Sequence, residues 1–292
     1  MKRIGYYKSC SLNASSNDYA RSLEMSFSKL GTRLVPIDDW NCCGASSAHS
    51  TNELLGLALP ARNLALAEQQ GLTTLLVPCS ACYSRMLTAA EKIRKNDDLA
   101  AEINEVIAPL KYMGTVQVKS ILEILWNEVG ANEILHAKKH DLGGMKVVCY
   151  YGCYLTRTPG VACFDNRENP QSMENLLRMV GAEPLDWPFK TDCCGAGYSL
   201  IDAPVTLQLC EKMYDMAHQL GADAIVATYP LCQTNLDVNQ DKLISQKSVP
   251  YRIPVFYVSD LIGVAAGAEF GNKLWRHRFV DPRELLNRYA LA

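Results

Sequence analysis

This chain of 292 residues has no long apolar run and no excess of charge of either sign. Without a stretch of about 18 or more uncharged apolar residues, we expect no helix that spans a membrane. Basic and acidic residues are mixed and the formal net charge is −2, which argues against nucleic-acid binding and against a polybasic membrane-binding surface. The segment Met1–Tyr7 lacks the apolar region and cleavage site of a secretory signal, so we expect a cytoplasmic protein.

Several cofactor motifs are also missing. No G-x-G-x-x-G follows a predicted strand and no P-loop occurs, so we expect no nucleotide cofactor. A ferredoxin-type C-x₂-C-x₂-C-x₃-C-P run is absent, and electrons would therefore have to come from, or go to, a partner chain. The five histidines give no ligand spacing, because we interpret the segment of His136 and His140 as a solvated helix end.

Cysteine, in contrast, is abundant, with twelve residues. A disulfide framework is typical of small secreted domains, whereas this chain is long and, with 48% hydrophobic residues, can build a core without cross-links. In a reducing compartment, clustered cysteines more often bind metal or carry redox chemistry. The arrangement of the cysteines is therefore the main source of functional predictions.

Two adjacent cysteines followed by a glycine occur twice, as NCCG at Asn41–Gly44 and as DCCG at Asp192–Gly195. Neighbouring side chains on a strand point to opposite faces, and a disulfide between them would be strained. The pair fits an irregular loop whose two sulfurs converge on a metal or a cluster, and the glycine permits left-handed backbone there. Because the motif recurs in the same surroundings, we expect one metal site in each half.

Predicted strands and helices alternate in the same order in both halves, which favours β-α-β units and a parallel sheet in each half. We predict an α/β protein of two related domains, residues 1–143 and 144–292, each with a small parallel sheet flanked by helices. Because cysteines follow the predicted strands, their sulfurs should meet at the carboxyl ends of the strands, where such folds bind ligands. We also predict a helix over residues 118–135 and a polar tail over residues 276–292.

The two halves supply different numbers of candidate ligands. The first half has five thiols, more than tetrahedral zinc or an ordinary cubane needs, so either one is a spectator or the cluster has an unusual shape; they are Cys10, Cys42, Cys43, Cys79 and Cys82. The second half has four, which suit a conventional [4Fe-4S] cluster or a structural zinc; they are Cys153, Cys193, Cys194 and Cys232. When the repeats are aligned, Tyr229 stands where the first half has Cys79.

A few other residues have weaker claims to a role. Cys149, in a predicted strand, and Cys210, at a helical core position, are interpreted as structural. Cys163 is interpreted as a loop thiol, although it could replace the missing ligand. Tyr229 is interpreted as an ordinary core or edge aromatic, with a cover over a cluster or substrate as the alternative. No catalytic residue is assigned; Asp192 and the tyrosines near it are the candidates for a general acid.

Together with the segments at 164–170 and 257–282, the two cysteine patterns resemble the B subunit of heterodisulfide reductase over nearly the whole chain. The resemblance implies a noncubane [4Fe-4S] cluster on each five-cysteine set, and cleavage of a disulfide by electrons that arrive one at a time. It also implies two partners, a small ferredoxin-like C subunit and a flavin-carrying A subunit. The first half fits such a noncubane cluster.

The second half departs from the family pattern because Tyr229 replaces a cysteine. We expect a cubane [4Fe-4S] cluster there, with zinc as the alternative. This departure favours a relative that acts on another sulfur compound, for example in a sulfur-oxidising heterodisulfide-reductase-like complex. The chain would then cleave or form a disulfide or a related sulfur bond.

Two other functions stay open. One is the iron–sulfur subunit of a lactate or glycolate oxidising system, which also carries paired-cysteine domains, although the segment at 257–282 argues against it. The other is a non-enzymatic scaffold with zinc in one or both sites, which would be colourless.

Overall fold

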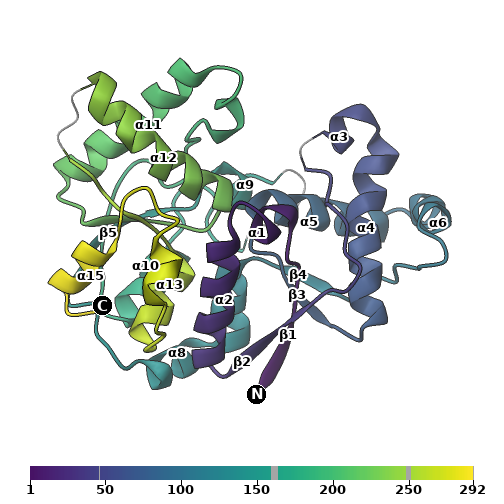
Figure 1. Cartoon of the computed structure of the whole chain (residues 1–292). Helices are drawn as coiled ribbons and strands as arrows, with labels where there is room; N and C mark the ends of the chain where they lie inside the picture. Colours follow the sequence, from purple (N-terminus) through teal and green to yellow (C-terminus); the bar gives the residue numbers. More distant parts are fainter. Residues whose placement is uncertain (46, 159–163, 248–250, 292) are drawn as a thin grey trace.

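The computed structural model describes residues 1–45, 47–158, 164–247 and 251–291, and these residues form two α/β halves. Each half contains a parallel sheet of four strands with helices packed against it (Figure 1). The predicted fold class, an α/β protein with two related domains, is thus confirmed. The division of the chain between residues 143 and 144 stays a prediction.

The first sheet has the strand order β2-β1-β3-β4. Its strands are β1 (Lys2–Tyr6), β2 (Thr32–Pro36), β3 (Thr74–Leu76) and β4 (Gln117–Lys119). The helices of this half are α1 (Cys10–Asn13), α2 (Asn17–Lys29), α3 (Ala48–Thr51), α4 (Glu53–Gln69), α5 (Ser80–Arg94), α6 (Asp97–Val106), α7 (Ile121–Glu123), the π-helix η1 (Ile124–Val129) and α8 (Ala131–Ala137). Because all three strand pairs are parallel, the carboxyl ends of the strands lie along one edge of the sheet.

The second sheet repeats this order as β6-β5-β7-β8, again with parallel pairs only. Its strands are β5 (Lys146–Tyr150), β6 (Glu183–Leu185), β7 (Ala224–Ala227) and β8 (Val255–Tyr257). The helices of this half are α9 (Cys153–Thr156), α10 (Ser172–Met179), the 3₁₀-helix η2 (Ala196–Tyr198), α11 (Ala203–Gln219), α12 (Pro230–Lys247), α13 (Val258–Ala265), α14 (Gly271–Trp275) and α15 (Arg283–Arg288). The central strand β7 is buried along its whole length, as expected for a parallel sheet covered on both faces.

The two halves are joined by helices α2 and α13, which pack side by side (Figure 1). A buried ion-pair network crosses this contact: Arg278 lies 3.2 Å from a carboxylate oxygen of Asp18 and 3.1 Å from one of Asp260. The Arg278 guanidinium also lies over the ring of Tyr257, at 4.6 Å from its centroid. Since Asp18 belongs to α2 and Asp260 to α13, a single arginine near the end of the chain neutralises carboxylates of both halves.

Two predictions about secondary structure were wrong in part. The first residues of the predicted helix over residues 118–135 instead belong to the edge strand β4, and helix starts only after Ser120. The hydroxyl of Ser120 accepts from Glu123 N, and the carboxylate of Glu123 accepts from Ser120 N, which caps the first turn. The predicted polar tail over residues 276–292 contains helix α15 and buries Arg278, Leu285 and Leu286. The tail is thus part of the core of the second half and of the junction.

Candidate metal centre

The five candidate thiols of the first half come from three separate segments at the carboxyl edge of the first sheet. Cys10 begins helix α1 just after β1, and Cys42 and Cys43 lie in the loop after β2. Cys79 precedes helix α5, with Cys82 in its first turn. The Sγ atoms of Cys43 and Cys82 lie 3.1 Å apart. Three thiols are buried and two are exposed, so the set has a covered side, made by Cys43, Cys79 and Cys82, and an open side, made by Cys10 and Cys42.

Hydrogen bonds between the thiols make some of these sulfurs more acidic than others. The Cys42 thiol, and after it the Cys82 thiol, donates to Cys43 and lowers the pKa of Cys43 to about 4. The single thiol proton of Cys82 is shared with Cys79, and this contact lowers the pKa of Cys79 as well. The donated protons are held more tightly, which raises the pKa of Cys42 and of Cys82. Thiolate is the form that binds metal, so the hydrogen bonds within the set favour the form of Cys43 and Cys79 that a metal needs.

A tyrosine hydroxyl anchors the paired-cysteine loop of the first half. The hydroxyl of Tyr7 donates to the carbonyl oxygen of Asn41 at 2.8 Å. The side chain of Asn63 on α4 makes two further bonds to the same residue, accepting from Asn41 N and donating to Asn41 O, each at 2.9 Å. The loop is therefore fixed at the residue before its first cysteine, which holds Cys42 and Cys43 in place without a metal.

The second half repeats this arrangement with four thiols. Cys153 begins helix α9 after β5, and Cys232 lies in the first turn of α12. The hydroxyl of Tyr150 donates to the carbonyl oxygen of Asp192 at 2.7 Å and accepts from Cys194 N at 3.0 Å. Hydrogen bonds from Cys153 and Cys232 lower the pKa of Cys193 to about 6 and that of Cys194 to about 7, respectively.

The glycine after each cysteine pair adopts a backbone conformation that other residues rarely reach. Gly44 has φ +74° and Gly195 has φ +78°. A Cβ atom on Gly44 would lie 2.8 Å from Cβ of Ala48, and one on Gly195 would lie 3.0 Å from Cα of Thr206. Both the left-handed turn and the close approach of a helix therefore require glycine in the two copies of the motif.

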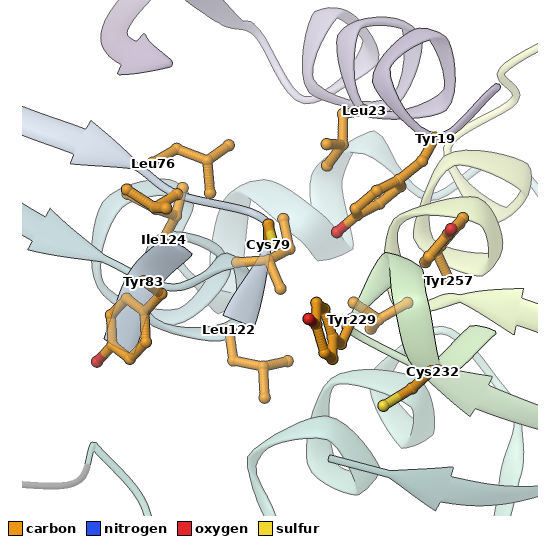
Figure 2. Close-up of a cluster of buried hydrophobic side chains, with 14 of the residues drawn as sticks. Tyr19, Leu23, Leu76, Cys79, Tyr83, Leu122, Ile124, Tyr229, Cys232 and Tyr257 are labelled. Atoms are coloured by element: carbon orange, nitrogen blue, oxygen red, sulfur yellow. The ribbon is translucent and has the colours of Figure 1, made fainter. Parts of the chain in front are cut away.

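Tyr229 occupies the position in the second half that Cys79 occupies in the first. Cys79 immediately precedes helix α5 and its carbonyl accepts from Tyr83 N at 2.8 Å; Tyr229 immediately precedes α12 and its carbonyl accepts from Gln233 N at 2.9 Å. Figure 2 shows Tyr229 between Cys79 of the first set and Cys232 of the second. The side chain is buried, so it fills the space between the two sets of thiols.

The remaining sequence candidates lie apart from these sets or behind them. Cys149 is buried in β5 and Cys210 is buried on α11, where it contacts the carbonyl of Cys194 at 3.6 Å, in agreement with structural roles. The prediction for Cys163 falls outside the described residues. The side chain of Asp192 is exposed, and its candidacy as a general acid stays a prediction. Sequence reasoning missed the anchoring tyrosines, although a tyrosine three residues before the first cysteine of each set was a repeated signal.

All of the clustered donors are thiols, and this donor set decides which groups could fit. Within the described ranges of the chain, no three His, Cys, Asp or Glu side chains are gathered around the position of a single metal ion. Iron–sulfur clusters are held by cysteine thiolates spaced around several irons, so they suit separate segments that meet at a sheet edge. The five thiols of the first half fit such a cluster, and the four of the second half match the ligand number of a cubane. Zinc, the alternative for the second half, also takes four ligands but would need these thiols to move closer together around one ion.

The family model of the CCG cysteine-rich domain matches residues 4–87 and residues 147–237, more than half of the chain. The chain belongs to the CCG-domain family. Each matched segment contains one complete set of candidate ligands, so the two halves are two CCG domains. This CCG-domain protein is also similar over its whole length to subunits of known oxidoreductases.

Three of these relatives cover nine-tenths or more of both chains. The CCG-domain protein is 31% identical to the 8-methylmenaquinol:fumarate reductase membrane anchor subunit of Wolinella succinogenes. The 286 aligned residues cover 97% of this chain and 99% of that protein. It is 27% identical to a protein of Archaeoglobus profundus that is named as similar to the B subunit of heterodisulfide reductase, and the 275 aligned residues cover 91% of each chain. It is also 27% identical, over 91% of this chain and 90% of that one, to the B subunit of a CoB-CoM heterodisulfide reductase of Methanosarcina acetivorans.

These relatives confirm the predicted relationship to the B subunit of heterodisulfide reductase. A crystal structure of a hypothetical protein from Helicobacter pylori shares the fold, with a TM-score of 0.75 at 15% identity; the match covers 95% of the CCG-domain protein and 52% of that chain. None of the helices in the described residues has the length and apolarity that a membrane crossing needs.

Proposed function

We propose that this protein is the iron–sulfur subunit of an oxidoreductase complex related to heterodisulfide reductase, and that its first site is the reactive centre. The observation that carries the proposal is the first set of five thiols, which is partly buried and partly open. Cys10, Cys42, Cys43, Cys79 and Cys82 would hold a noncubane [4Fe-4S] cluster. When bound, that cluster would supply electrons singly to a sulfur–sulfur bond.

The two sides of the first site have different tasks in this proposal. Cys43, Cys79 and Cys82 lie on the buried side, where low exposure keeps water from the sulfurs. Cys10 and Cys42 lie on the exposed side, where a substrate sulfur can approach. The overall reaction is RS–SR + 2 e⁻ + 2 H⁺ → 2 RSH, or its reverse, so the complex must deliver two electrons in separate steps.

The second site has a supporting role. Cys153, Cys193, Cys194 and Cys232 would hold a cubane [4Fe-4S] cluster, with zinc as the alternative. Iron there would relay electrons, and zinc would only stabilise the domain. Electrons would come from a ferredoxin-like C subunit and a flavin-carrying A subunit in the cytoplasm, because the chain itself has no ferredoxin-type cysteine run.

A second candidate function is electron relay without a sulfur substrate. The relative from Wolinella succinogenes is named as a subunit of a quinol:fumarate reductase. A cavity between the two halves, lined in part by Tyr83, Leu122 and Tyr151, has a volume of about 10 Å³. That space holds about one water molecule, whereas pockets for small-molecule ligands typically measure about 300–1,000 Å³. A relay would need no larger cavity at that place, and the 31% identity to the Wolinella subunit over 97% of this chain favours a chain that passes electrons through its two sites to a partner subunit.

The first experiment is to measure iron, zinc and acid-labile sulfide per chain after anaerobic purification, with EPR of the oxidised and reduced protein. About eight iron would support two [4Fe-4S] clusters, and about four iron with one zinc would make the second site structural. Reductive cleavage of a low-molecular-weight disulfide by the reduced protein would support the sulfur reaction. Re-oxidation of the reduced protein by a quinone or fumarate reductase partner alone would favour the relay. Turnover with lactate would favour the subunit of a lactate or glycolate oxidising system. Zinc as the only metal after iron reconstitution would leave a scaffold.

A further inference from the structure

We infer that Tyr229, although it stands at the missing ligand position of the second half, is a residue of the first site, where its hydroxyl and that of Tyr19 donate hydrogen bonds toward the sulfur of Cys79. These donors would raise the reduction potential of the centre held there. The inference rests on the proposed function, because it concerns an iron–sulfur group at the first site. It makes both tyrosines positioning residues.

The direction of the two side chains supports this assignment. In Figure 2, the hydroxyl ends of Tyr19 and Tyr229 both point toward Cys79, one from α2 and the other from the turn before α12. The hydroxyl of Tyr83, which is buried nearby on α5, points away from Cys79. Cys79 and Cys82 of the first set both raise the pKa of Tyr229, so this residue lies close to the first set as well as to Cys232 of its own half.

The rings are held firmly enough to keep this direction. Tyr19 is stacked on Tyr257 with ring centroids 3.7 Å apart and planes 17° from parallel. Its hydroxyl is 3.5 Å from the carbonyl oxygen of Thr228, the residue before Tyr229, which is a long bond that leaves it able to turn to a better acceptor. Tyr229 meets Tyr154 edge to face at 6.1 Å. The two phenols therefore approach Cys79 from fixed and separate directions.

Tyrosine hydroxyls can replace the donor that Cys79 loses when the first set binds metal. At present a hydrogen bond from the Cys82 thiol lowers its pKa, with help from the backbone N–H groups of Ala81 and Cys82. A coordinating thiol loses its proton, so Cys82 could no longer donate when it is a ligand itself. Burial raises the pKa of both tyrosines, which keeps their hydroxyls protonated and able to donate.

Hydrogen bonds to cluster sulfurs change the reduction potential because they stabilise the more negative, reduced form. Tyr229 would therefore favour the reduced state of the first site. A cysteine at position 229, as at the aligned position of Cys79, would be a fifth ligand for the second half. The exchange of cysteine for tyrosine thus removes a ligand from one site and gives a hydrogen-bond donor to the other.

The test compares Tyr229→Phe and Tyr19→Phe with Tyr83→Phe, a matched control that removes a buried hydroxyl pointing away from the site. Each protein is purified anaerobically and its iron content is measured. A potentiometric titration followed by EPR then gives the midpoint potential of the first site, which is identified as the signal lost in Cys79→Ser. ENDOR spectra in H₂O and D₂O report exchangeable protons coupled to that signal.

We expect unchanged iron in all three variants. Tyr229→Phe should have a more negative midpoint potential and lack one exchangeable proton in its ENDOR spectrum. The potential should shift less in Tyr19→Phe and should match that of the wild type in Tyr83→Phe. Full iron with an unchanged potential and unchanged ENDOR spectra in Tyr229→Phe would overturn this inference and leave the proposed function intact. Loss of iron in that variant would also overturn it, because Tyr229 would then be needed to hold the cluster. A wild-type chain without iron after reconstitution would overturn both.

Discussion

The two halves of this protein have the same fold but different sets of candidate ligands. Each has a four-stranded parallel sheet of the same order, a paired-cysteine loop after the second strand in sequence and a tyrosine hydroxyl bonded to the carbonyl before that loop, at 2.8 Å for Tyr7 and 2.7 Å for Tyr150. The clearest difference is one position at a strand end, where Cys79 is matched by Tyr229. The scaffold that presents the ligands is thus shared by the halves, while the number of ligands is not.

A second difference concerns exposure. In the first set three of five thiols are buried, and Tyr229 of the other half lies beside one of them. In the second set Cys194 and Cys232 are buried, while Cys193 is exposed and Cys153 is half-buried. The two sets are therefore enclosed to a similar degree, but the covered side of the first site includes Tyr229 of the other half, and its open side has two exposed thiols. This arrangement fits a reactive centre that both halves help to cover.

The largest effect should come from removing one matched ligand from each half. Cys82→Ser should lose the iron of the first site, about four per chain, and keep the metal of the second, because a serine hydroxyl is a poor substitute for a soft thiolate. Cys232→Ser should do the opposite. Iron and zinc analysis together with EPR measures both results.

Cys149→Ala is the control for this pair, because it removes a thiol buried in β5 away from both sets. It should keep the full metal content. If Cys82→Ser and Cys232→Ser lost the same metal, the two sets would not be separate sites, and the comparison between the halves would fail.

The next largest effect should follow from loss of the arginine that links the halves. Arg278→Met leaves Asp18 and the fully buried Asp260 without their cation, and breaking a buried pair in this way costs about 3–5 kcal/mol in the free energy of unfolding. Urea unfolding followed by circular dichroism measures the change. Arg276→Met removes an exposed charge two residues away and should change stability by less than about 0.5 kcal/mol.

The pH dependence of this variant sharpens the prediction. Burial raises the pKa of Asp260, and Arg278 lowers it, so loss of the arginine should raise that pKa further. A carboxyl with a raised pKa in the folded state is neutral at low pH, where its burial costs little, and is penalised as the pH rises through that pKa. The deficit of Arg278→Met should therefore shrink as the pH falls from 7 toward 5; a deficit independent of pH would point to lost packing instead.

Much of the fold and the candidate site could be predicted from local signals. Alternating strand and helix patterns gave two parallel sheets, and the repeated cysteine pair, with the positions of Cys79 and Cys232, gave two sets of thiols at sheet edges. The substitution at Tyr229 was also visible from alignment of the repeats. These features depend on short segments and on the rule that parallel strands place their carboxyl ends together.

The features that escaped prediction depend on contacts between distant segments. The polar pattern of residues 276–292 indicated a solvated tail because nothing near Arg278 in the sequence supplies its partners; Asp18 comes from the opposite end of the chain. Strand β4 has only three residues, too few for a period-two pattern to stand out beside the helix that follows it. The direction of Tyr229, away from its own half, likewise depends on how the halves meet.

A smaller effect should result from adding one methyl group to each paired-cysteine loop. Gly44→Ala and Gly195→Ala place a Cβ on left-handed backbone and in close contact, at a cost of about 2 kcal/mol in the free energy of unfolding. Gly44→Ala should cost more, because its new Cβ lies 2.8 Å from Cβ of Ala48, which moves only with its backbone, whereas the nearest atom to the new Cβ of Gly195 is Cα of Thr206 at 3.0 Å.

Gly197→Ala is the matched control, since a Cβ there meets nothing within 4 Å and the residue has no positive φ. Its unfolding free energy should match that of the wild type, and its metal content should be complete. Equal stability of all three variants would show that the loops relax freely, and the requirement for glycine in the motif would then lie in metal binding alone.

The smallest effect should separate the two anchoring tyrosines. Tyr7→Phe removes one hydrogen bond to a loop carbonyl and should cost about 1 kcal/mol in unfolding free energy. Tyr150→Phe should cost more, about 2 kcal/mol, because it also leaves the buried N–H of Cys194 without its acceptor. Tyr6→Phe is the control: the Tyr6 hydroxyl is buried and has no hydrogen-bond partner among the described residues, so its removal should be neutral or stabilising. If Tyr7→Phe and Tyr150→Phe were equally costly, the extra bond in the second half would contribute nothing, and the two loops would be anchored equally despite their different ligand sets.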